Sequence, residues 1–198
     1  MAAGIGEYVY EADKALFNWL QHTMVADWLG GSSVYLGNVY FWTPFFVFCG
    51  VLVIMANPKR GGWNVFFALG TVIVAYQASV LLSSFLRHPP PYYFAAMEGI
   101  RLPAFTVEAT FSLPDWPMAA FFGLFAFLKG RLRRYRRPFP RILWLGPILF
   151  LFFRLLAGYA YPVDLLTSIL IGFFMAFLMG KLAEGVDMLM EGEEPQQS

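Results

Sequence analysis

Long apolar segments separated by basic turns are the feature that most restricts how this chain can fold. Segments of about 20 residues match the roughly 30 Å hydrocarbon core of a bilayer. Hydrophobic residues make up 59% of the sequence and charged residues only 14%, whereas a soluble domain has about 25% charged residues. The sequence therefore predicts an all-α integral membrane protein with five spans, at about residues 38–56, 63–86, 115–128, 142–159 and 163–182.

Residues 7–29 precede these spans and have an amphipathic pattern. Leu16, Phe17 and Leu20 recur at helical spacing, with polar residues on the opposite side. We expect an interfacial helix that lies on or dips into the membrane, and that also packs against the bundle. The Gly30–Ser33 sequence is expected to end it.

One compact membrane domain over residues 1–190 accounts for these elements, and the acidic residues 191–198 are expected to form a disordered tail. The single cysteine, Cys49, excludes a disulfide within the chain. The sequence also lacks the ligand set of a zinc site. We therefore expect no metal and no cofactor.

The distribution of basic residues predicts the orientation. Lys59 and Arg60 lie in the turn between the first two spans, and seven further Lys and Arg residues lie between Lys129 and Arg141. Cytoplasmic loops carry an excess of Lys and Arg, and with five spans both basic loops fall on one side. We predict a bacterial inner-membrane protein whose basic loops and C-terminus are cytoplasmic, with the N-terminal helix and residues 87–116 outside.

The basic loop is interpreted as a topology signal that also contacts anionic lipid headgroups, through Arg131, Arg133, Arg134, Arg136 and Arg137. Each such residue contributes about 1 kcal/mol at a membrane surface. No aromatic-interleaved binding fold surrounds the loop, so no nucleic-acid partner is expected.

Unusual charges gather on the opposite side. Arg154 and Asp164 are ten residues apart in otherwise apolar sequence, and an ionisable group at bilayer depth costs roughly 2.5–3.5 kcal/mol. Arg87 and Asp115 are predicted at the same depth. Two arginines and two acids at one depth are typical of an anion site, because guanidinium forks match phosphate oxygens.

These residues resemble the three motifs of the type-2 phosphatidic acid phosphatase (PAP2) family, which shares its helical core with vanadium haloperoxidases. The motifs are Lys-x6-Arg-Pro, Pro-Ser-Gly-His and Ser-Arg-x5-His-x3-Asp. Arg87 matches the arginine of the first, Phe111–Phe121 corresponds to the second, and Phe153–Asp164 corresponds to the third. The resemblance covers nearly the whole chain and implies the family's helical bundle.

The chain departs from the family at the residues that carry its chemistry. In the family, the third-motif histidine attacks phosphorus and the second-motif histidine protonates the leaving oxygen; here these positions are Ala160 and Pro117. The first-motif lysine is Val80, or Leu81 if the register slips by one. Alanine offers no nucleophile and proline no proton. The resemblance thus implies a pseudophosphatase, and we predict a non-enzymatic subunit of a membrane complex, in contact with lipid, other membrane proteins or copies of itself.

Two alternatives stay open. His88, next to Arg87, is the candidate nucleophile of a divergent lipid-phosphate or isoprenoid-diphosphate phosphatase at the outer face. Arg154 and Asp164 form either a buried ion pair, with Arg87 as third member, or a retained lipid-phosphate site. Asp115 favours the ion pair, because a carboxylate repels an anion and can pair with an arginine.

Overall fold

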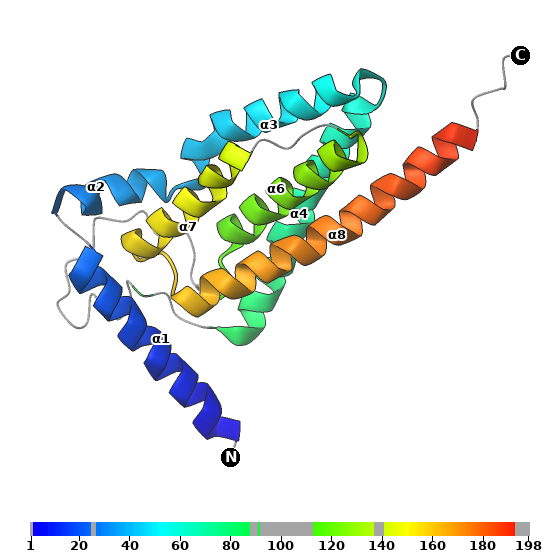
Figure 1. The fold of residues 1–198 in the computed structure, drawn as a ribbon. Coiled ribbons are helices and arrows are strands. Elements are labelled where there is room, and N and C mark those ends of the chain that lie inside the picture. The colour runs from blue at the N-terminus through cyan, green and yellow to red at the C-terminus, as the bar shows by residue number, and fades with distance from the viewer. Residues whose placement is uncertain (1, 25–26, 88–90, 92–112, 137–140, 193–198) are drawn as a thin grey trace, which may run out of the picture.

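The computed structural model describes residues 2–24, 27–87, 91, 113–136 and 141–192. The described chain is helical and contains no strand, which confirms the all-α prediction. Figure 1 shows the longer helices side by side in one bundle, with α1 extending away from it. The elements in chain order are α1 (Ala2–Met24), α2 (Asp27–Leu36), η1 (Val39–Trp42), α3 (Thr43–Ala56), η2 (Pro58–Arg60), α4 (Gly61–Leu86), α6 (Trp116–Arg134), η3 (Arg141–Trp144), α7 (Leu145–Ala157) and α8 (Pro162–Gly192).

Three of the described helical segments are long and apolar enough to cross a membrane: Val39–Ala56, Pro58–Leu86 and Pro162–Met190. They coincide with the first, second and fifth predicted spans, and they confirm an integral membrane protein. The helices α6 and α7 lie where the third and fourth spans were predicted. That these two also cross the bilayer stays a prediction.

The N-terminal region was predicted wrongly in one respect, because residues 7–29 do not form a single helix that ends at Gly30–Ser33. Instead α1 ends at Met24 and α2 contains the glycines and serines. A glycine lowers the stability of a helix by only about 1 kcal/mol, so Gly30 and Gly31 do not by themselves end α2, which packs against α7. Beyond α2 the approach is close: a side chain on Gly37 would meet the Phe153 carbonyl at 3.2 Å and the Tyr159 ring at 3.1 Å.

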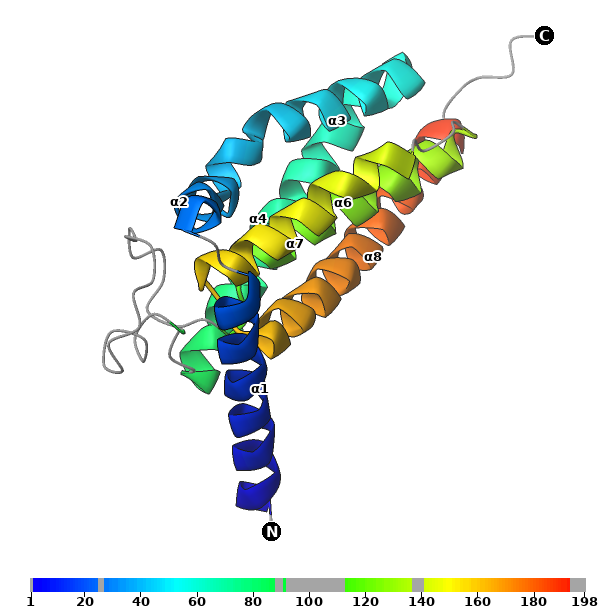
Figure 2. The same cartoon turned by 60° about the vertical axis from the view of Figure 1, so that its left-hand side comes forward.

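The helix α6 lies at the centre of the bundle and packs against both α8 and α4. Figures 1 and 2 show α6 and α8 running alongside each other. They approach most closely at two glycines, since a Cβ on Gly172 would lie 2.8 Å from the Gly123 nitrogen and would overlap the Ala119 carbonyl oxygen. Small residues permit such close backbone contact between membrane helices.

Both α6 and α8 are longer than the spans predicted for them. The region from Lys129 to Arg134 was expected in a loop, but it forms the last turns of α6. Lysine and arginine are good helix formers, and the buried contacts of Arg131 described below hold these turns in place. The helix α8 runs to Gly192, so residues 191 and 192, which were predicted in the tail, belong to it. Residues 193–198 lie outside the described chain.

Candidate functional site

The side chain of Arg154 is the centre of the charged site. It projects from the last turn of α7 and is only 2% exposed. Its Nη2 lies 2.6 Å from Oδ1 of Asp115, and its Nη1 donates to the Gly37 carbonyl oxygen at 2.8 Å. The guanidinium also lies 4.4 Å from the centre of the Tyr159 ring. Arg154 therefore joins α7 to the start of α6 and to the segment after α2.

Asp115 has two tasks in this arrangement. As the N-cap of α6, its Oδ2 accepts a hydrogen bond from the Met118 backbone N–H at 3.3 Å. Its own N–H donates to Ser168 Oγ at 2.7 Å, and that hydroxyl donates to the Asp164 carbonyl oxygen. The carboxylate thus caps one helix and pairs with Arg154, while its backbone is tied to α8.

Asp164 lies in the first turn of α8 and is 1% exposed. Its Oδ2 accepts from the Tyr161 backbone N–H at 3.2 Å. A carboxylate at this end of a helix interacts favourably with the helix dipole. Burial, together with Tyr10, Asp164 and Asp13, raises the pKa of the Tyr161 hydroxyl.

The predicted site residues are only partly brought together. The buried ion pair of Arg154 is present, but the described pair is with Asp115 and not with Asp164 as first expected. Arg87 does not join them: it is exposed, follows α4 in a left-handed conformation (φ 50°), and its Nε donates to the Ser84 carbonyl oxygen at 3.4 Å. His88 lies outside the described residues.

The two positions at which the sequence resemblance implies a histidine are both buried. Ala160 is fully buried in a cluster with Met118, Phe121 and Phe150, and Pro117 is buried in the first turn of α6. Among the described residues, no group of three or more His, Cys, Asp or Glu side chains is placed to hold a metal ion.

Two residues near the site were missed by sequence reasoning. Asp13 was assigned to the polar face of the N-terminal helix, but it is 6% exposed and its Oδ1 accepts from the Val163 N–H of α8 at 3.1 Å. Ser168 lies one turn after Asp164, and this spacing was the available signal for its role. For Asp13 no local signal exists, because its partner is 150 residues away.

Asp13→Ala is expected to lower the stability of the protein by about 1 kcal/mol, since loss of a helix cap costs roughly 0.5–2 kcal/mol. That corresponds to a fall of about 2–4 °C in the melting temperature, measured in detergent. Glu11→Ala, at an exposed position of the same helix, is the control and should leave the melting temperature unchanged. Equal effects of the two substitutions would show that Asp13 is not a cap.

A second charged cluster lies at the other end of α6 and α8. Arg131 was predicted to face lipid headgroups, but it is 3% exposed. Its Nη2 lies 2.7 Å from Asp187 Oδ2, and its Nε donates to Asn64 Oδ1 at 2.7 Å. Arg60 and Arg134 also lie 3.3 Å from Asp187. Arg131 was predicted in an exposed loop, but the Asp187 carboxylate on α8 draws it into the bundle.

Comparison with known proteins identifies the fold. No family model matches the sequence, and no curated protein matches it. Among solved structures, the chain resembles the crystal structure of a transmembrane PAP2-type phosphatidylglycerolphosphate phosphatase from Bacillus subtilis, with a TM-score of 0.58 and 17% sequence identity. The match covers 96% of this chain and 90% of that chain. This likeness confirms the PAP2-like helical fold.

The same comparison corrects one prediction. The substitutions at Ala160 and Pro117 led us to predict that the chain is not an enzyme, but the solved protein that shares its fold is a phosphatase. Ala160 and Pro117 mean that the chain has no histidine side chain at these two positions. They do not establish a loss of activity.

Proposed function

Starting from the PAP2-like fold, we propose that the chain is a structural or interaction subunit of a membrane complex. The observation that carries the proposal is the buried pair between Arg154 and Asp115, at 2.6 Å. In a lipid-phosphate site a guanidinium faces its ligand. Here it meets a carboxylate and a backbone carbonyl, so that the charges connect helices of the bundle.

The exposed faces of α3 and α4 support an interaction role. They carry large aromatic side chains such as Phe48, Phe66 and Phe85, each more than half exposed. In a membrane, such apolar faces contact lipid acyl chains or a neighbouring helix, where association depends on van der Waals packing. The partners we propose are membrane lipids together with other membrane proteins or further copies of this chain.

This proposal predicts a defined complex when the protein is extracted from its native membrane in mild detergent. The chain should elute with its partner, or with itself, at a fixed molar ratio that persists through a second purification step. Size-exclusion chromatography with light scattering measures that ratio. Elution as a monomer that carries only lipid and detergent would contradict the proposal.

A second candidate function is phosphate release from a lipid phosphate or an isoprenoid diphosphate at the outer face. The observation that favours it is the fold shared with a phosphatidylglycerolphosphate phosphatase. His88 is the proposed nucleophile, next to Arg87 in sequence. A histidine can form a phosphorylated intermediate, as covalent catalysis requires.

Release of inorganic phosphate from phosphatidylglycerol phosphate, phosphatidic acid and undecaprenyl diphosphate tests this candidate. If it holds, His88→Ala reduces release to the background without protein. His22→Ala, which removes the other histidine of the chain, should retain the rate. No release by the unmodified protein from any of the three substrates would exclude the candidate.

We also propose that the basic end of the bundle faces the cytoplasm of a bacterial inner membrane. The positive-inside rule supports this orientation. The two charged clusters along α8 fit opposite membrane interfaces: Asp164 and Asp187 are 23 residues apart, or about 35 Å at 1.5 Å per residue. That distance is close to the thickness of a hydrocarbon core.

A further inference from the structure

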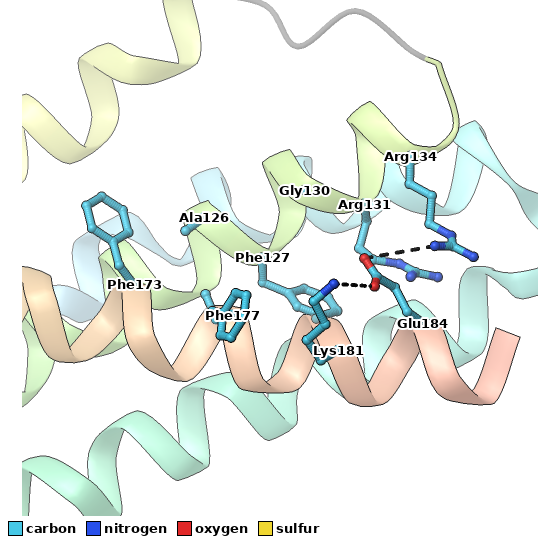
Figure 3. A pocket seen from close by; sticks show the side chains of 11 residues that line it. Ala126, Phe127, Gly130, Arg131, Arg134, Phe173, Phe177, Lys181 and Glu184 are labelled. Carbon is cyan, nitrogen blue, oxygen red and sulfur yellow. Dashed lines mark hydrogen bonds and ion pairs between the residues drawn. The ribbon is translucent and has the colours of Figure 1, made fainter. Parts of the chain in front are cut away.

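A cavity of about 340 Å³ lies between α6 and α8, at the end of the bundle opposite to Arg154. Figure 3 shows that its lining combines two kinds of side chain. Aromatic rings of Phe127, Phe173 and Phe177 form one part, and charged groups of α6 and α8 form the other. The volume falls within the roughly 300–1,000 Å³ that is usual for ligand pockets.

The charged part of the lining is cationic. The cavity lining contains the cations Arg131, Arg134 and Lys181 and the carboxylate of Glu184. Arg131 and Arg134 also pair with Asp187, which lies outside the lining. The Nη1 atom of Arg131 is buried and has no hydrogen-bond partner within the described residues, although the rest of its guanidinium is bonded to Asp187 and neighbouring groups. An unsatisfied buried donor is costly, and it leaves part of the positive charge of Arg131 uncompensated beside the cavity.

Glu184 already pairs with the two other cations of the lining. Its carboxylate lies 2.9 Å from Lys181 Nζ and 3.9 Å from Arg134 Nη1, as the dashed lines in Figure 3 show. Both contacts are on partly exposed side chains, for which an ion pair contributes little. A phosphate can therefore compete with Glu184 for the same two cations.

The apolar part of the lining continues onto the exposed surface of α8. Phe173 and Phe177 are 38% and 60% exposed, and Phe174 and Leu178 beside them are exposed as well. Glu184 is 20 residues from Asp164 along α8, or about 30 Å. The cationic part thus lies near one membrane interface, and the rings lie toward the hydrocarbon.

We propose that this cavity binds an anionic phospholipid, with its headgroup phosphate against Arg131, Arg134 and Lys181 and an acyl chain along Phe173 and Phe177. A lipid fits better than free phosphate, because only a lipid uses both the cationic and the aromatic lining. The site does not depend on the proposed function, and it is separate from the Arg154–Asp115 pair.

The test compares phosphatidylglycerol and phosphatidylcholine binding to the full chain by native mass spectrometry. The double substitution Arg134→Gln/Lys181→Gln should weaken phosphatidylglycerol binding roughly 10- to 30-fold, from about 1 kcal/mol per basic residue. The matched control Lys59→Gln/Arg141→Gln removes the same charge from exposed residues outside the cavity and should retain the affinity. Equal losses in both double variants would overturn the proposal.

Two single substitutions test the same cavity without removing cations. A Cβ on Gly180 meets no atom within 4 Å, so Gly180→Leu should fill the cavity, retain the melting temperature and abolish phosphatidylglycerol binding. Glu184→Gln should strengthen binding several-fold, because it removes the competing carboxylate. If Gly180→Leu fails to fold, the phosphatidylglycerol affinities of the charge variants decide whether the proposal holds. Equal affinity for phosphatidylcholine, or full competition by inorganic phosphate, would exclude an anionic-lipid site.

Discussion

Asp115→Asn is expected to destabilise the protein by about 3–5 kcal/mol, the usual cost of removing one partner from a buried ion pair. Asparagine is as good an N-cap as aspartate, so the start of α6 should persist. The loss of stability therefore measures the contribution of the Asp115 carboxylate, which lies 2.6 Å from Arg154. The readout is the melting temperature in detergent, with an expected fall of roughly 6–20 °C.

A double-mutant cycle separates the ion pair from general damage to the site. Arg154→Met alone leaves the Asp115 carboxylate buried, whereas Asp115→Asn/Arg154→Met removes both charges and should recover much of the stability. Glu11→Gln removes an exposed carboxylate and should change nothing. A double variant no more stable than Asp115→Asn would show that the pair does not hold α6 and α7 together.

Gly172→Val is the other substitution with a large expected effect. Its side chain would collide with backbone atoms of Ala119 and Gly123, which cannot move without separating α6 from α8. Overpacking a core costs about 1–3 kcal/mol, and the cost here should lie at the upper end because backbone is involved. We expect a melting temperature lower by roughly 5–10 °C.

The matched control for this substitution is Gly185→Val on the same helix. A Cβ on Gly185 meets no atom within 4 Å, so the two variants differ in packing but not in residue type. Gly185→Val should retain the melting temperature of the unmodified protein. If both variants melt alike, the close crossing of α6 and α8 does not determine stability.

The spans that could be predicted from sequence are those set by local composition. Residues 38–56, 63–86 and 163–182 are apolar throughout, and each is recovered as a helix of spanning length. The helix through Gly30–Ser33 was not predicted, because glycine and serine were interpreted as a helix end. The local penalty is only about 1 kcal/mol per glycine, and the packing of α2 against α7 is not visible in local sequence.

The residues of the candidate site also divide into those that local sequence identifies and those that depend on tertiary packing. Arg154 and Asp164 were identified because a charge in an apolar segment is conspicuous in sequence alone. The choice of Asp115 as partner for Arg154 depends on the packing of α6 against α7, which no local pattern encodes. Arg131 was misjudged for this reason: neighbouring basic residues suggested a solvated loop, and its carboxylate partner lies on another helix.

The partner of Arg131 has a consequence for biosynthesis. Asp187 follows Arg131 by 56 residues, so the ribosome adds it only after α6 and its basic end have emerged. During insertion these arginines still lack that carboxylate, and they can act as the positive charges that set topology. When α8 enters the membrane later, the same arginines become its ion-pair partners. On the proposed orientation, one set of residues first directs the chain and then fixes its last helix.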